Sequence, residues 1–202
     1  MSIRRLSVGA TSFCAMGLAT IAVAWACTGG GLFSGADMTL TPNNGTCSAA
    51  TWASTPATPG AACPTTATTV TGTGFINDNG AASPPVPATV DLYWLDEPFS
   101  PAVLGGPGGE GEPAKADICT TKGVRVAAAV PVETAAGPSQ GSFPKAGNPA
   151  VVLNLPPVGS ATYQDGSTRT VRAYYGANAL CAVWVHVGAG HDSAVGNQFN
   201  LF

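Results

Sequence analysis

The sequence predicts an all-β protein built as a two-sheet sandwich of about seven or eight strands. Charged residues make up only 9% of the 202 residues, against about 25% in a typical soluble domain. Glycine and proline, which favour turns, supply 26 and 17 residues, and the hydrophobic fraction of 45% is too high for a disordered chain. Short segments rich in residues branched at Cβ lie between these turns, and no sustained helical period follows residue 26.

Eight segments carry the strand pattern, and each is bounded by turn residues. In the third of them, Val90, Leu92 and Trp94 share one face, whereas Asp91 and Tyr93 share the other. The eight segments are Met38–Pro42, Thr65–Phe75, Thr89–Leu95, Gly123–Val132, Val151–Leu155, Thr168–Tyr175, Leu180–Val187 and Asn197–Phe202.

The same alternation assigns faces in the later segments. Trp184 and His186 fall opposite the valine face of their segment, so Trp184 is a candidate exposed side chain. We expect two long loops, a disulfide-stapled loop or short hairpin at Thr46–Pro64 and a mobile loop at Leu104–Pro113. Two sets are predicted to face inward, namely Val151, Leu153 and Leu155, and Val171, Ala173 and Tyr175. Two further sets are each predicted to share one face, namely Val124, Val126, Ala128, Val130 and Val132, and Cys181, Val183, Val185 and Val187.

The N-terminus has the order of a secretory signal. Arg4 and Arg5 precede a charge-free run, and Ala24-Trp25-Ala26 has the small-x-small form of a cleavage site. An uncleaved membrane anchor is the alternative, because the run is just long enough to span a bilayer. We therefore divide the chain into a signal peptide at 1–26, a flexible lead at 27–37 and one β-sandwich domain at 38–202.

The charge balance argues against nucleic-acid binding. Removal of Arg4 and Arg5 leaves six basic against eleven acidic side chains, a net charge of about −5. Such a chain is repelled by a polyanion at long range. The composition also excludes a coiled coil and a helical bundle.

Cysteine usage indicates an oxidising compartment. Five cysteines remain after the leader, and an odd number leaves one thiol over. Our preferred bridges are Cys47–Cys63 and Cys119–Cys181, although spacing does not prove connectivity. Cys27 directly follows the cleavage site and is either a lipidated N-terminal residue or a partner in a bridge, in which case another thiol is free.

One segment carries a family resemblance. Thr69–Phe75, which reads TVTGTGF, is similar to the V-T-G-x-G-F strand of IPT/TIG-type immunoglobulin-like domains, and Leu40–Gly45 and Val90–Trp94 resemble its neighbouring elements. The resemblance implies an immunoglobulin-like sandwich, a scaffold used in receptors, enzymes and adhesins. Ala24–Thr28 followed by such a domain is similar to secreted proteins of high-GC Gram-positive bacteria. The chain departs from the family in the inserted Cys47–Cys63 segment and in a longer middle region.

Three sequence motifs are interpreted as turns or loops. Gly137–Gly141 matches G-x-S-x-G, but the prolines that follow prevent the helix of a nucleophile elbow. Gly106–Gly111 matches G-x-G-x-x-G, but Glu110 and the following Glu112 would repel phosphate. His186, His191 and Asp192 flank one turn and do not supply three converging ligands. We expect no catalytic set, no metal and no cofactor.

The function that these observations favour is a non-catalytic exported module for cell-surface structure, adhesion or binding of an extracellular protein or glycan. Contact with a membrane is expected only if Cys27 is lipidated or the signal is uncleaved. The alternative is a carbohydrate-binding module that uses exposed Trp52 and Trp184, since exposed aromatic residues often mark binding sites. A secreted hydrolase is the third and least favoured interpretation.

Overall fold

The computed structural model describes residues 35–53, 55–76, 86–104, 113–186 and 191–202. The predicted signal peptide, most of the lead, Cys27 and the Gly106–Gly111 motif lie outside the described residues. Within the described ranges, none of the helices combines the length and hydropathy needed to span a membrane.

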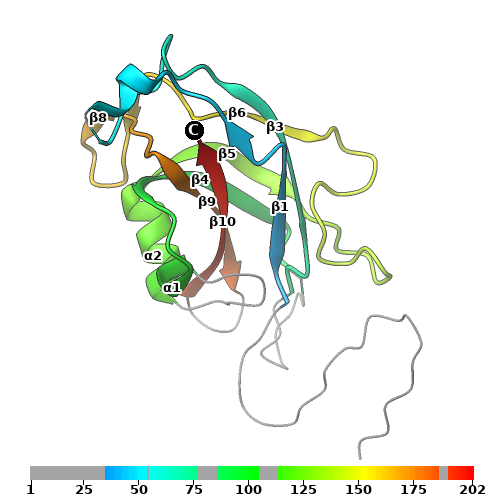
Figure 1. Ribbon diagram of the computed structural model, residues 1–202. Coiled ribbons are helices and arrows are strands. Elements are labelled where there is room, and N and C mark those ends of the chain that lie inside the picture. The colour runs from blue at the N-terminus through cyan, green and yellow to red at the C-terminus, as the bar shows by residue number, and fades with distance from the viewer. Residues whose placement is uncertain (1–34, 54, 77–85, 105–112, 187–190) are drawn as a thin grey trace, which may run out of the picture. The chain divides into compact units, whose positions relative to one another are not determined.

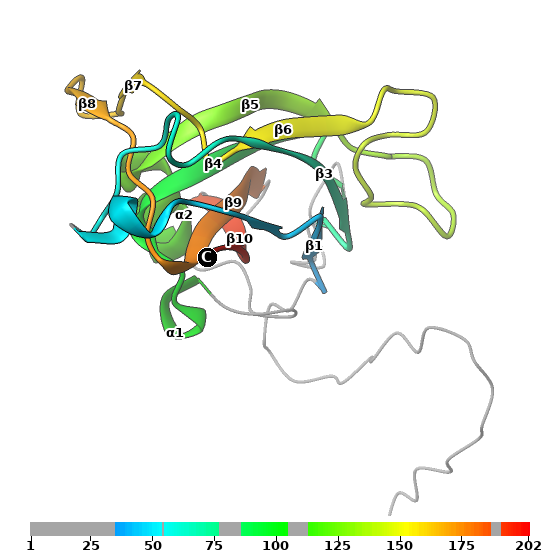
Figure 2. The same cartoon turned by 45° about the horizontal axis from the view of Figure 1, so that its top comes forward.

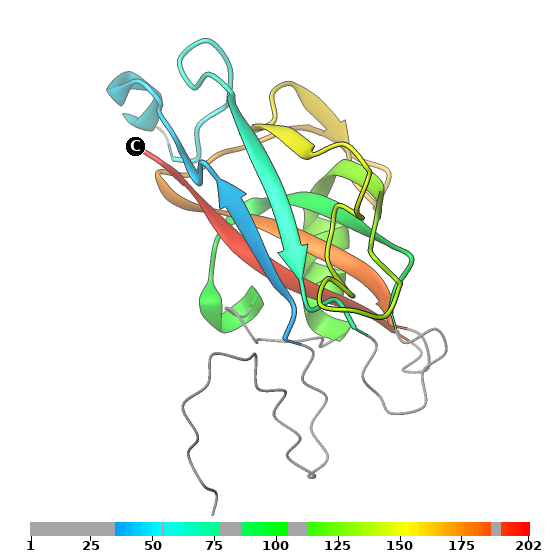
Figure 3. The same cartoon turned by 90° about the vertical axis from the view of Figure 1, so that its right-hand side faces the viewer.

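The described chain forms a β-rich, two-sheet fold, as the sequence predicts. The smaller sheet has the order β1-β3-β6 and the larger has the order β2-β10-β9-β4-β5. Figures 1 and 3 show the layers in the order smaller sheet, larger sheet, helices. The strands are β1 (Asp37–Thr41), β2 (Asn44–Gly45), β3 (Thr66–Thr73), β4 (Thr89–Pro98), β5 (Gly123–Pro131), β6 (Val151–Leu155), β9 (Gly176–His186) and β10 (His191–Leu201).

A separate hairpin lies at one end of the sandwich. It pairs β7 (Ser160–Thr162) with β8 (Thr168–Thr170) in antiparallel register, apart from both main sheets (Figure 2). Three helical segments complete the described elements, η1 (Ala49–Ala53), α1 (Pro101–Leu104) and α2 (Pro113–Lys122).

The main core lies between the two sheets and is aromatic. Phe75 meets both Phe143 and Trp184 edge to face, with ring centroids 5.1 and 5.0 Å apart, and Trp94 meets Phe199 at 6.1 Å. Such edge contacts add about 0.5–1.5 kcal/mol each beyond the area they bury. Trp94 is buried with Val90 and Leu92, as their shared face predicts.

The prediction that Trp184 is exposed is wrong. Trp184 is buried in the main core, and the opposite face of β9, with Cys181 and Val183, is buried as well. Alternation shows which residues of β9 share a face. It identifies the buried face only when the other face is left to solvent. Here both faces of β9 are covered, one by the smaller sheet and one by helices.

Helix α2 is the element that the sequence did not predict. Its buried side chains are few, Ala116 and Cys119, so its apolar periodicity is too weak to be seen. Pro113 occupies its first position, where the missing N–H has no intrahelical partner to lose. Gly123 follows α2 directly and is the first residue of β5. A residue with a side chain would not fit there, because its Cβ would lie 2.2 Å from the Cys119 carbonyl oxygen. The prediction that no helix follows the leader is thus wrong for this segment, and α2 covers part of the larger sheet. Residues 105–112 of the predicted loop lie outside the described residues.

Both preferred disulfides are present. Cys47–Cys63 closes the loop that carries η1, and Cys119–Cys181 ties α2 to the centre of β9. Leu95, Leu104 and Ala194 complete a second apolar cluster around this bridge. Disulfides of this kind are typical of proteins in oxidising, extracytoplasmic compartments.

A bulge in β5 overturns the prediction that Ala128 shares a face with Val130. Ala129 has φ 50°, and its N–H donates to Asp91 Oδ1 at 2.7 Å. The register with β4 shifts on both sides of Leu92, so Ala128 and Ala129 are exposed while Val130 returns to the core. An extra residue in one strand has this effect on the faces that follow.

Tyr175 is also placed wrongly by alternation. Val171 and Ala173 are buried as predicted, but Tyr175 is 62% exposed. The buried Asn178 amide accepts from the Tyr174 N–H at 2.7 Å and donates to the Tyr174 carbonyl at 2.8 Å. These bonds hold a turn before β9, and Tyr175 points outward because the turn ends the extended backbone.

We predict that Gly72→Ala destabilises the fold by about 1–3 kcal/mol, the range for overpacking a dense core. An added Cβ at Gly72 would lie 2.1 Å from Phe143 and 2.6 Å from Phe75. Urea unfolding followed by tryptophan fluorescence measures the change. Gly60→Ala is the matched control, because a Cβ there has open space, and equal stabilities for the two variants would contradict the packing described here.

We predict that loss of Cys119–Cys181 destabilises more than loss of Cys47–Cys63. The first bridge spans 62 residues and the second 16, which in the chain-entropy account correspond to about 4 and about 3 kcal/mol. Paired Cys→Ala variants, compared by chemical denaturation, test the order. Cys119–Cys181 also holds α2 on the sheet, so the reverse order would mean that α2 docks without it.

Candidate functional site

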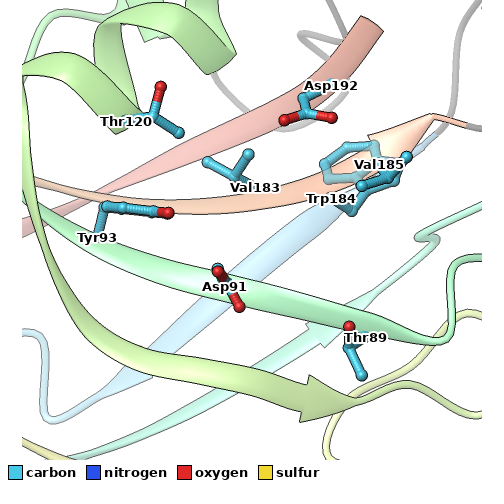
Figure 4. Close-up of a pocket in the computed structure, with 8 residues that line it drawn as sticks. All are labelled: Thr89, Asp91, Tyr93, Thr120, Val183, Trp184, Val185 and Asp192. Atoms are coloured by element: carbon cyan, nitrogen blue, oxygen red, sulfur yellow. The ribbon is translucent and has the colours of Figure 1, made fainter. Parts of the chain in front are cut away.

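The outer face of the larger sheet is left open beyond the edge of α2. A hollow of about 150 Å³ lies there, and β4, β9, β10 and α2 all contribute to its walls (Figure 4). Its lining residues are Thr89, Asp91, Tyr93, Thr120, Val183, Trp184, Val185 and Asp192.

A second hollow continues the first toward the β7–β8 hairpin. It has a volume of about 410 Å³ and shares Tyr93, Thr120 and Asp192 with the first. Its other lining residues are Gly123, Arg125, Thr162, Tyr163 and Gln164. Because three residues belong to both hollows, we describe the two together as the outer furrow.

Strand geometry explains why these side chains meet. Asp91 and Tyr93 alternate with Leu92 and Trp94 along β4, so they face away from the main core. In the sheet register, Asp91 lies beside Val183 and Tyr93 beside Cys181, and Asp192 of β10 lies beside Val185. The furrow therefore has an apolar floor on β9 and polar walls on the neighbouring strands.

Asp91 organises the β5 side of the furrow. One carboxylate oxygen holds the bulge at Ala129, and the other accepts from Arg125 Nη1 at 3.2 Å. Burial raises the pKa of Tyr93, the charge of Asp91 raises it further, and Arg125 opposes the shift. Tyr93 thus stays a neutral hydrogen-bonding phenol at neutral pH.

A buried carboxylate lies at the hairpin end of the molecule. Asp96 is 4% exposed and accepts two hydrogen bonds from Arg172, from Nε and Nη2, each at 2.9 Å. Trp94 Nε1 donates to the Arg172 carbonyl at 3.0 Å, and the Tyr174 hydroxyl donates to the Asp96 carbonyl at 2.8 Å. These contacts fix the segment after β8 against the end of β4.

The aromatic residues predicted to bind sugar behave differently from one another. Trp184 is removed from consideration by its burial. Trp52 is half-buried against the core, and Tyr175 packs on it edge to face with centroids 5.3 Å apart. The exposed member of this pair is Tyr175, which the sequence assigned to the core.

One of the three motifs interpreted as turns or loops, Gly137–Gly141, is found in a turn. Ser139 of the G-x-S-x-G match lies in a turn between β5 and β6. His186 pairs with His191 in the register of β9 and β10. In the described part of the chain, no group of three or more His, Cys, Asp or Glu residues is placed to hold a metal ion.

Sequence reasoning placed Asp91 and Tyr93 on a common outer face but did not identify them as a site. The available signal was their alternation with the core residues. The missing information was the position of α2, which leaves this part of the face open.

Comparison with protein-family models, with curated proteins and with solved structures finds no match to this chain.

We predict that the free energy of unfolding falls as pH rises above the usual tyrosine pKa of 10.0. Burial raises the pKa of Tyr93, Tyr163 and Tyr174 in the folded chain. The unfolded chain releases these protons first, so higher pH favours unfolding. Urea unfolding at a series of alkaline pH values measures the decline, and Tyr93→Phe should make it shallower. An unchanged slope in that variant would contradict the role of Tyr93.

Proposed function

We propose that the protein is a non-catalytic exported module that binds an extracellular partner in the outer furrow. The observation that carries the proposal is the furrow itself, an open concave surface beside the part of the larger sheet that α2 covers. Concave sites with an apolar floor and a few convergent polar groups are the usual ligand sites of proteins.

The lining favours a polar, hydroxyl-rich ligand such as a glycan. Tyr93 offers an aromatic ring, on which the C–H face of a sugar can stack. Arg125, Asp192 and Gln164 offer donors and acceptors for hydroxyl groups. An apolar ligand would take these polar groups out of water without offering hydrogen bonds in return, which disfavours it.

Export is supported by the two disulfides and by the signal-like N-terminus. An immunoglobulin-like topology of the IPT/TIG type remains a prediction, which the resemblance of Thr69–Phe75 supports. The proposal of a non-catalytic role rests on furrow side chains suited to hydrogen bonding and stacking. Robust turnover in a screen of ester, peptide and glycoside substrates, lost on substitution of His186 or His191, would overturn it.

A second candidate for glycan contact is the pair Trp52 and Tyr175. The exposed Tyr175 ring is supported from below by the edge contact with Trp52. The exposed Tyr175 ring can provide a stacking surface for a sugar. The carbohydrate-binding alternative then uses Trp52 and Tyr175 in place of Trp52 and Trp184.

We predict that Tyr93→Ala weakens oligosaccharide binding by about tenfold or more, since stacking and a hydrogen bond are lost together. The measurement is an amide NMR titration of the mature protein with a panel of soluble hexasaccharides of glucose, xylose and N-acetylglucosamine. We expect shifts at Tyr93, Thr120 and Gln164 for at least one of them.

Tyr175→Ala is the matched control, because it removes a tyrosine from the other aromatic surface. Loss of binding in Tyr175→Ala but not in Tyr93→Ala would transfer the site to the Trp52–Tyr175 pair. Absence of binding to every oligosaccharide would contradict the glycan assignment.

A further inference from the structure

Two arginine side chains converge at the hairpin end of the molecule on a single carboxylate. Arg172 forms a bidentate pair with Asp96, and Arg169 Nη1 lies 3.9 Å from Asp96 Oδ2. One buried negative charge thus faces two positive charges, and the group carries a net charge of about +1. The nearby Glu97 is paired with Lys122.

Arg169 is held in place by its contact with Tyr163, and it forms no hydrogen bond with Asp96. Its guanidinium lies over the Tyr163 ring, 3.7 Å from the centroid, which is the geometry of a cation–π contact. Arg169 Nη1 lies 3.9 Å from Asp96 Oδ2, so the two side chains form an ion pair but no hydrogen bond. A stacked guanidinium loses little further freedom when it binds a ligand.

Both guanidinium groups reach the surface. The side chains of Arg169 and Arg172 are 41% and 44% exposed, although Asp96 beneath them is buried. Asp96 engages Nε and Nη2 of Arg172, so the remaining Nη1 edge of this fork points away from the carboxylate. The exposed Asp165 accepts from the N–H and hydroxyl of Ser167, and these bonds, together with the charge of Arg169, lower the pKa of Asp165.

An independent observation at the same place is the Tyr163 hydroxyl. It is buried and has no hydrogen-bond partner among the described residues. It is electrostatically coupled to Asp96, Arg169, Arg172 and Tyr174, so it belongs to this group of side chains. A buried hydroxyl without a partner is uncommon and indicates a polar group still to be supplied.

We propose that Arg169, Arg172 and Tyr163 form a binding site for an oxyanion, namely a carboxylate, sulfate or phosphate group carried by an extracellular molecule. Two guanidinium groups match the paired oxygens of such a group, which is the geometry of the strongest charge-assisted hydrogen bonds. Asp96 acts as a positioning residue, because it holds Arg172 and attracts Arg169. The site does not depend on the function proposed for the outer furrow, since its cationic donors lie outside the furrow lining.

The test is an NMR titration of the arginine Nε–H signals of the mature protein with sodium sulfate, at an ionic strength kept constant with sodium chloride. We expect saturable shifts for Arg169 and Arg172. Arg125 is the matched reference, because it is exposed and paired with Asp91 on another strand. Non-saturable shifts, or equal shifts for Arg125, would overturn the site. Parallel titrations with acetate and inorganic phosphate identify the preferred oxyanion.

Two variants separate a binding role from a structural one. Arg169→Gln should raise the sulfate dissociation constant about tenfold or more, the loss expected for one charge-assisted hydrogen bond, whereas Arg125→Gln should leave it unchanged. Tyr163→Phe removes a buried hydroxyl without a partner, so it should not lower the thermal stability of the free protein. It should still weaken sulfate binding, and unchanged sulfate affinity in both Arg169→Gln and Tyr163→Phe would overturn the proposal.

Discussion

The structure depends on the burial of β9 on both faces. Trp184 and Leu180 pack into the core between the sheets, while Cys181 and Val183 lie under the helical cover. Burial of a side chain of this size contributes about 1.5–3 kcal/mol, so a central strand covered twice stabilises both clusters at once. The Cys119–Cys181 bridge secures this arrangement, because it ties α2 covalently to β9 next to the buried Ala116.

Three polar side chains then determine the local geometry that the apolar core leaves open. Asp91 holds the β5 bulge, Asp96 holds Arg172, and Asn178 holds the turn at Tyr174. Each of these three side chains is buried or half-buried and forms hydrogen bonds with specific partners. Removal of one partner from such a pair is strongly destabilising, because the other remains desolvated. These hydrogen-bonded polar side chains therefore contribute more to the specific local geometry than to net stability.

The two candidate binding surfaces differ in chemistry, and they meet at Tyr163. Tyr163 lines the outer furrow, and its ring packs against the Arg169 guanidinium. Its hydroxyl also interacts electrostatically with Asp96. The furrow is aromatic and polar with both signs of charge, which suits a hydroxyl-rich ligand. The arginine pair has a surplus of positive charge, which suits an anionic group. A chain with a net negative charge can hold such a group only where cations are locally concentrated and fixed.

The sequence by itself determined most of the strands and the inward positions of Trp94 and Leu155, because alternation and turn residues act over a few neighbouring positions. It suggested the two disulfides, but only the tertiary structure brings their cysteines together, across 16 and 62 residues. The two polar furrow residues of β4 could be predicted to share a face in the same way. Only the tertiary structure decided which faces are covered, and therefore that Trp184 is buried and that Tyr93 is open. The positions of Ala128 and Tyr175 depend on hydrogen bonds to Asp91 and Asn178. The bond from Ala129 to Asp91 joins residues 38 apart, and Asp96 meets Arg172 across 76 residues, so no local pattern predicts either contact. Asn178 is only four residues from Tyr174, but the alternation of apolar residues does not record its hydrogen bonds.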